Sequence, residues 1–109
     1  MLAVIFEVEI AENQSDRYFD TSATLKPILE AIPGFISVER FQSLNNNHKY
    51  LSLSYWRDEK AVKQWRNTYP HREAQKLGRN GIFTDYRLKV VTVIRDYGLN
   101  AREEVPKED

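Results

Sequence analysis

Trp65 and His71 are the residues whose types and spacing suggest chemistry, and they lie in the stretch WRNTYPHREAQ at residues 65–75. On one continuous helix their side chains would point about 120° apart, because six residues advance the chain by roughly 600°. Pro70 disfavours helical geometry at the preceding residue, so we expect the helix to break there. The break places His71 in the first turn of a new helix, where the helix dipole disfavours protonation of imidazole. A general base or a metal ligand requires such a neutral imidazole.

Each member of this pair also has a purely structural interpretation. His71 is typical of a solvated residue at a helix start, with Arg72 as its neighbour. Trp65 shares a helical stripe with Ala61 and Val62, which is the pattern of a core residue. The second histidine, His48, follows three asparagines in a predicted turn, and its spacing from His71 does not indicate a metal site.

The composition limits the classes of partner. The chain has 109 residues, which fits one domain, and its 16 basic and 16 acidic side chains cancel. This balance argues against nucleic acid or an anionic membrane as a partner. The absence of cysteine excludes disulfides and thiolate catalysis. The opening MLAVIFEVEI is too short to cross a bilayer and has no basic leader, so we expect a cytoplasmic protein.

The periodicity of apolar residues predicts six elements that position these side chains. They are a strand at 2–10, a helix from an N-cap at Ser15 to a stop at 32–34, strands at 35–44 and 49–56, a helix from an N-cap at Asp58 to Gly78 that Pro70 interrupts, and a strand at 84–97. The order β-α-β-β-α-β is typical of the ferredoxin-like α+β fold, one antiparallel sheet with both helices on one side. Residues 1–97 form the predicted domain, and 98–109 form a charged tail.

The sheet face opposite the helices also carries apolar residues. Ile5, Val91 and Val93 fall on it by strand alternation. A sheet face with several uncovered apolar groups usually has a partner, and a second copy is the commonest one. We therefore expect a homodimer through this face.

Three stretches together resemble the antibiotic biosynthesis monooxygenase (ABM) domain family, and the resemblance covers residues 2–97. They are PGFISVERFQS, LSLSYWRDEKAVKQW and HREAQKLGR. The resemblance implies a dimeric α+β barrel, in which two ferredoxin-like units pack sheet to sheet. Some members of the family are cofactor-independent oxygenases that act on hydroquinones or polyketide phenols, and others degrade haem.

On this resemblance we expect a cofactor-independent monooxygenase that acts on a small aromatic molecule and dioxygen in a pocket between helices and sheet. His71 would be the base, Trp65 and Tyr55 the pocket walls, and Arg72 the group that stabilises a phenolate. The two alternatives are a haem-degrading monooxygenase and a non-catalytic dimer that binds a small ligand.

The haem alternative fits the sequence less well. The haem-degrading members have a tryptophan on the second helix, a ligand histidine ten residues later and an asparagine from the first strand. Trp65 matches the first feature, but Gln75 stands ten residues later and Glu7 stands on the first strand. The histidine occurs at His71 instead, so we expect no cofactor.

Overall fold

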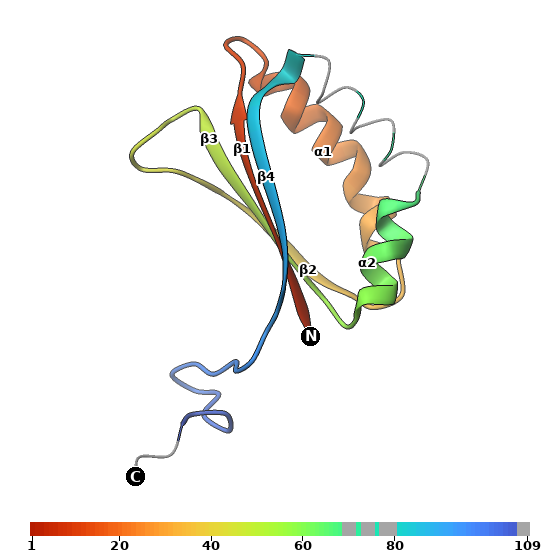
Figure 1. Cartoon of the computed structure of the whole chain (residues 1–109), viewed down its shortest axis with the longest axis vertical. Coiled ribbons are helices and arrows are strands. Elements are labelled where there is room, and N and C mark those ends of the chain that lie inside the picture. The colour runs from red at the N-terminus through yellow and green to blue at the C-terminus, as the bar shows by residue number, and fades with distance from the viewer. Residues whose placement is uncertain (69–71, 73–75, 77–80, 107–109) are drawn as a thin grey trace.

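The fold is an antiparallel sheet of four strands with two helices on one of its sides, as Figure 1 shows for a computed structural model. The structure describes residues 1–68, 72, 76 and 81–106. In chain order the elements are β1 (Leu2–Ile10), α1 (Ser15–Glu30), β2 (Phe35–Gln42), β3 (Lys49–Trp56), α2 (Glu59–Arg66) and β4 (Phe83–Thr92). The strand order across the sheet is β2-β3-β1-β4. The predicted β-α-β-β-α-β arrangement is confirmed.

Alternation along β1 decides which side chains face the helices. Val4 packs against a buried cluster that includes residues of both helices, and Val8 is a fully buried member of a second cluster. Ile5 and Glu7 therefore point to the opposite side, because successive strand residues alternate between faces. A register shift follows Glu9, where Ile10 pairs with Phe83.

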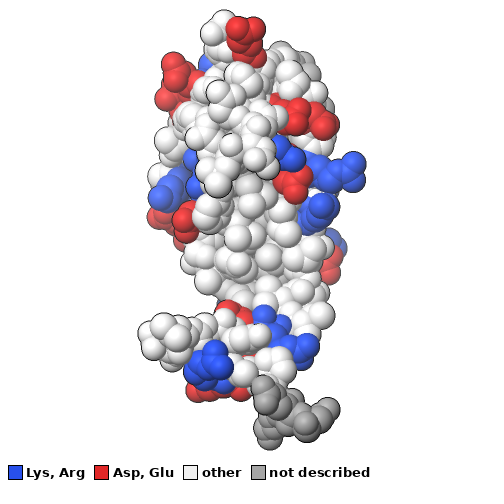
Figure 2. Space-filling view, turned by 90° about the vertical axis from the view of Figure 1, so that its left-hand side faces the viewer, with Lys and Arg blue, Asp and Glu red and all other residues white. Residues whose placement is uncertain are grey.

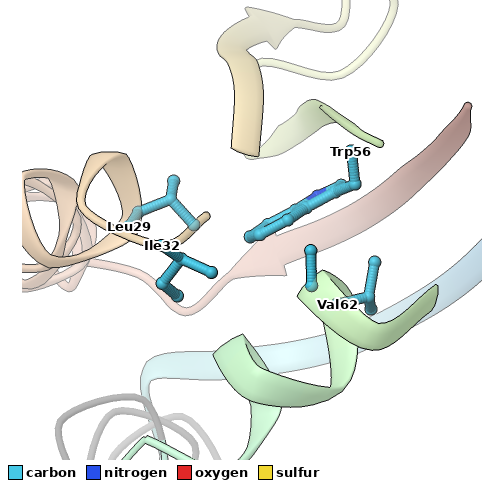
Figure 3. Packing of buried hydrophobic residues seen from close by; sticks show 5 residues of the cluster. Leu29, Ile32, Trp56 and Val62 are labelled. Carbon is cyan, nitrogen blue, oxygen red and sulfur yellow. The ribbon is translucent and has the colours of Figure 1, made fainter. Parts of the chain in front are cut away.

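Two separate hydrophobic clusters hold the helices to the sheet. The first contains Leu29 near the end of α1, Ile32 just after that helix, Trp56 at the end of β3, and Ala61 and Val62 on α2. Figure 3 shows Leu29, Ile32 and Val62 directed towards the indole ring of Trp56. The second cluster lies at the other end of the sheet and contains Val8, Ile10, Tyr18 and Ile82. Helix α1 contributes to both clusters, so it ties the two ends of the molecule together.

The start of α1 differs slightly from the prediction. Ser15 is the first helical residue, and Gln14 precedes it without a capping hydrogen bond from its side chain. The Gln14 side chain instead accepts a hydrogen bond from Arg17 at 3.0 Å, which bridges the first turn. Pro27 lies inside α1.

The predicted cap of α2 is confirmed. Asp58 has an extended backbone, and its Oδ1 accepts a hydrogen bond from the Ala61 amide at 3.0 Å. Its Oδ2 accepts a hydrogen bond from Nε of Arg57 at 3.2 Å. The hydrogen bond from the Ala61 amide has the largest effect on the pKa of this carboxyl, and the hydrogen bond from Arg57 has the next largest. Both hold the pKa below its ordinary value of 3.8. The ionised side chain therefore fixes the start of the helix that carries Trp65.

We expect the stabilising effect of the Asp58 charge to depend on pH in one direction. Because folding lowers the pKa of Asp58, the effect is present above the ordinary value of 3.8 and is lost as the pH falls through the folded pKa. Asp58→Asn keeps an acceptor oxygen but cannot ionise. Melting curves should show the variant a few degrees less stable near pH 7, and this gap should narrow below about pH 4. A gap that is the same at both pH values would contradict the prediction.

The chain beyond β4 leaves the body of the molecule. Figure 1 shows the chain after β4 running away from the sheet and helices. The amide of Val93 donates to the Met1 carbonyl at 3.0 Å, and contacts among the following residues, such as Arg102 over the Tyr97 ring, are local. Among the described residues, no helix is long and apolar enough to cross a membrane.

Candidate functional site

A cavity of about 580 Å³ lies between the two helices and the sheet. Its walls are mainly apolar and aromatic: Val4, Phe6, Tyr18, Phe19, Leu25, Leu29, Val38, Trp65, Ile82, Phe83, Tyr86 and Leu88. The polar residues that line it are Thr21, Ser22, Lys26, Glu39, Arg40, Ser52 and Ser54. The cavity has the size and the composition of a typical small-molecule site, an apolar pocket with a few placed polar groups.

Helical and strand periodicity explain why these residues converge. On α1, Tyr18, Ser22, Leu25 and Leu29 are spaced three or four residues apart, so they share the face that meets the sheet. On the strands, every second residue faces the helices, as Val4 and Phe6 do on β1. The cavity lining therefore draws on residues of both hydrophobic clusters.

Aromatic rings close the cavity at the end where α1 begins. The Tyr18 ring lies 5.4 Å from that of Phe19 and 5.7 Å from that of Phe83, measured between centroids. Phe83 also meets Phe6 edge to face at 5.8 Å. Edge and tilted contacts of this kind are favourable and hold rings in defined orientations. This wall is therefore ordered without a ligand.

Arg40 brings a positive charge to this aromatic wall. It lies on β2, and its guanidinium carbon stands 5.1 Å from the Tyr18 ring centroid and 5.7 Å from that of Phe19. Its Nε donates a hydrogen bond to the Tyr18 hydroxyl at 3.3 Å. Stacking on two rings and one hydrogen bond orient the guanidinium at the cavity.

Ser54 is the buried polar group of the cavity floor. It lies on β3, and its Oγ accepts a hydrogen bond from Nε1 of Trp56 at 2.9 Å. Buried hydroxyl and indole groups need such partners, since leaving either one unpaired costs stability. The bond fixes the Trp56 ring below the cavity, and Trp56 itself does not line it.

The two tryptophans differ in burial, and Trp56 is the more buried of them. The pattern around Trp65 favours the core, yet Trp65 is half-buried, packs against the first cluster and lines the cavity. Trp56, which closes a strand beside the charged Arg57, is only 1% exposed and belongs to the core. The reason is that β3 ends where α1 and α2 converge, and the sequence alone does not show this.

Tyr55 lies away from the cavity, although the sequence analysis assigns it to the pocket wall. It stands between Ser54 and Trp56 on β3, which both face the helices. Alternation therefore directs Tyr55 to the opposite face, where its Cα pairs with those of Ala3 and Ser37. The structure therefore does not place Tyr55 in the wall of this cavity.

Two further predicted site residues follow α2. His71, the predicted base, lies outside the described residues, as does Pro70. Arg72 is exposed, its amide donates to the Thr68 carbonyl at 3.1 Å, and it does not line the cavity. Of the described residues predicted for the site, Trp65 is the one that the structure places in the cavity wall.

The other residues weighed for metal or haem chemistry also lie away from the cavity. His48 is exposed in the loop between β2 and β3, and its amide donates to Oδ1 of Asn46 at 3.0 Å. Glu7 lies on the outer sheet face, where Lys49 is its ionic partner at 3.7 Å. The part of the chain that the structure describes contains no group of three or more His, Asp or Glu side chains able to hold a metal ion.

Arg40 and Ser54 are the site residues that the sequence analysis misses. A signal for Arg40 exists in the strand pattern, because Val38 and Arg40 share a face of β2. A charged residue in register with an inward-facing valine is unusual and marks a polar group at the edge of the core. Ser54 carries a weaker version of the same signal, since it is small and occurs in many strands.

A family model described as antibiotic biosynthesis monooxygenase matches residues 1–77, which is more than half of the chain. The chain belongs to the antibiotic biosynthesis monooxygenase family. The match covers β1 to the end of α2 and therefore most of the cavity lining. The resemblance found in the three sequence stretches is confirmed.

One relative is similar in sequence to the whole length of this chain. Jasmonate monooxygenase ABM of Pyricularia oryzae is 41% identical over 109 residues, all of this chain. The chain spans about half the length, 51%, of that relative.

Two solved structures show the same fold at low identity. Rv0793 of Mycobacterium tuberculosis has a TM-score of 0.79 and 11% identity, over 89% of this chain and 98% of its own. A variant of SnoaB, a cofactor-independent oxygenase from Streptomyces nogalater, has a TM-score of 0.76 and 12% identity, over 87% of this chain and 94% of its own. At these identities the similarity shows the fold alone.

Proposed function

We propose that this protein is a cofactor-independent monooxygenase that oxidises a small, mainly apolar molecule in the cavity between the helices and the sheet. The observation that carries the proposal is the cavity itself, about 580 Å³ with aromatic walls, in a member of the antibiotic biosynthesis monooxygenase family. A relative named as a jasmonate monooxygenase and a fold neighbour described as a cofactor-independent oxygenase support it.

The proposed substrate is an electron-rich aromatic, such as a hydroquinone or polyphenol. Dioxygen has a triplet ground state and reacts slowly with closed-shell molecules unless they are electron-rich. Deprotonating a phenol creates such a donor. One oxygen atom then enters the product as a new carbonyl, and the other leaves as water. The substrate supplies the two electrons and two protons that this requires, so no external reductant is needed.

The protein has two tasks in this scheme. The apolar walls, including Trp65, exclude water from the anionic substrate and favour its approach to dioxygen. A base removes the phenolic proton, and His71 is the proposed base because of its place after Pro70 in the sequence. Arg72 remains the proposed partner of the phenolate on the same sequence argument.

Dioxygen consumption by chelator-treated protein tests the proposal. We expect turnover of one member of a panel of hydroquinones and polyphenols, with jasmonate included because of the relative's name. His71→Ala should lower kcat at least about a hundredfold, as expected for loss of a general base. His48→Ala is the matched control, because His48 is exposed in the β2–β3 loop and should keep wild-type turnover.

Three results would contradict the assignment. Wild-type turnover in His71→Ala would remove His71 as the base. If the protein binds a ligand but consumes no dioxygen with any compound of the panel, the non-catalytic binding dimer would be favoured. A Soret band on addition of haem, lost in His71→Ala, would favour the haem-degrading alternative.

We also propose that the protein acts as a homodimer through the outer face of the sheet. This face carries Ile5, Leu51, Leu53 and Val91 by register, and Phe41 on it is 43% exposed. Figure 2 shows a broad surface over this side of the molecule where charged side chains are sparse. A second copy with the same apolar face is the partner that best complements it.

Light scattering at micromolar concentration tests the dimer. We expect a mass twice the 12.9 kDa of one chain for the wild type. Leu53→Arg should shift the mass to that of a monomer, because it places an unpaired charge in the middle of the face. Leu44→Arg is the control, since Leu44 is fully exposed in the β2–β3 loop and should leave the dimer intact. A wild type that scatters as one chain would refute the proposal.

A further inference from the structure

We propose that Arg40 binds the carboxylate of the ligand, so that the cavity selects an amphipathic carboxylic acid, with its acid group at Arg40 and its apolar part between the helices and the sheet. The inference deepens the proposed function and rests on it for the cavity being the substrate site. It specifies the one chemical group that the ligand must carry besides an apolar body.

The guanidinium of Arg40 has donors to spare. It has five N–H groups in a planar fork. One of them, on Nε, is used by the Tyr18 hydroxyl at 3.3 Å. Within the described part of the chain, the two terminal nitrogens form no hydrogen bond. Four donors are thus left for a ligand at the cavity wall.

The charge of Arg40 is likewise unbalanced. The ion pairs among the described residues join Lys49 to Glu7 and Arg57 to Asp58, and neither involves Arg40. Glu39 also lines the cavity, but it is next to Arg40 on an extended strand, and consecutive side chains point to opposite faces. Lys26 on α1 adds a second cation to the lining. The described lining thus has two cations and one carboxylate.

Pre-orientation makes Arg40 an efficient anion site. The rings of Tyr18 and Phe19, at 5.1 and 5.7 Å, already hold the guanidinium, so little side-chain freedom remains to be lost on binding. A carboxylate matches the planar fork and accepts two parallel N–H bonds. Arg40 is itself exposed, so the selectivity comes from the paired, charge-assisted hydrogen bonds and not from exclusion of water.

The surroundings favour a carboxylate over a phosphate. A phosphate group presents a third oxygen and a second charge, which need donors from further directions. Tyr18 and Phe19 contact Arg40, and Ser52 is its cross-strand partner in the lining, so the described side-chain donors beside the guanidinium are two neutral hydroxyls and no second cation. A singly charged planar acid needs no donors beyond the guanidinium fork and these hydroxyls.

Calorimetric titration with decanoate and 1-decanol tests the inference, because the two probes share an apolar chain and differ in the acid group. At pH 8 we expect wild-type protein to bind decanoate at least about tenfold more tightly than decanol, as charge-assisted hydrogen bonds imply. Arg40→Gln should lose this preference by weakening decanoate binding alone, and Arg40→Lys should keep part of it. Arg66→Gln is the control, since Arg66 is exposed on α2 and does not line the cavity.

Equal affinity of the wild type for the two probes would overturn the inference, as would a full preference retained in Arg40→Gln. Loss of the preference in Lys26→Gln alone would also overturn it, because Lys26 would then hold the anion. Tighter binding of decyl phosphate than of decanoate would refute the choice of carboxylate. If Arg40→Gln does not fold, the wild type and Arg40→Lys decide the question.

Failure of the proposed function gives a different pattern. An acid preference that depends on Arg40, without dioxygen consumption on any compound, would defeat the oxygenase and leave the anion site. Turnover of neutral phenols without any acid preference would defeat the anion site and leave the oxygenase.

Discussion

Replacing Trp56 with alanine is expected to lower the free energy of unfolding by about 3–5 kcal/mol. The indole ring is 1% exposed and lies between Leu29, Ile32 and Val62. Its removal leaves a cavity where both helices meet the sheet. It also leaves the Ser54 hydroxyl without the indole N–H that it accepts at 2.9 Å. For a domain of this size the melting temperature should fall by more than about 10 °C.

Urea unfolding of three variants distinguishes the core role of Trp56 from a general effect of losing an indole ring. Trp65→Ala is the matched control, because Trp65 is half-buried at the cavity wall and should cost less stability. Trp56→Phe should cost less than Trp56→Ala, since a ring still fills the cluster. Equal losses for Trp56→Ala and Trp65→Ala would contradict the role of Trp56 as the centre of the first cluster.

Gly34→Ala is expected to destabilise the protein by about 2–5 kcal/mol, the sum of a backbone and a packing effect. Gly34 has a φ of 94°, a conformation that residues with a Cβ rarely adopt. A Cβ added there would stand 2.8 Å from the Cβ of Ala61, which is a buried residue of α2. Neither atom can move without shifting backbone, because both belong to short side chains.

Two other glycines allow the two effects to be separated in thermal melts. Gly81 has a φ of 109°, but an added Cβ meets nothing within 4 Å, so Gly81→Ala should show the backbone effect alone. A Cβ added at Gly98 would also meet nothing within 4 Å, and the φ of Gly98 lies outside the left-handed region. Gly98→Ala should therefore change the melting temperature little. We expect the loss of stability to be largest for Gly34→Ala, smaller for Gly81→Ala and smallest for Gly98→Ala. If Gly34→Ala and Gly81→Ala lost the same stability, contact with Ala61 would have no effect.

The element order could be predicted from the sequence because alternation and helical spacing are strong in β1, α1 and β3. Strand ends were less predictable, since they depend on the partner strand. β4 was expected to run from 84 to 97, but it ends at Thr92, where its partner β1 begins at Leu2. Beyond Thr92 the chain makes one more backbone hydrogen bond, from Val93 to Met1. Among the described residues, no strand pairs with the chain after that point.

The candidate site was less predictable than the fold because it depends on which elements converge. Trp65 was identified from residue type, and it lines the cavity together with Tyr18 and Phe19. Tyr55 was misplaced because the sequence shows that strand residues alternate but does not show which face the helices cover. Arg40 was missed because the pairing that brings β2 beside Tyr18 of α1 joins residues 22 positions apart.

The position of the cavity between two separate hydrophobic clusters has a consequence for cooperativity. Without a ligand, the cluster around Trp56 and the cluster around Val8 are connected mainly through α1 and the sheet. Each end of the molecule is then expected to open partly on its own. A ligand that fills the space between them adds contacts to both, so its binding energy stabilises the two ends together. Amide hydrogen exchange at the two ends should become correlated as the ligand concentration rises, which turns two local opening events into one global one.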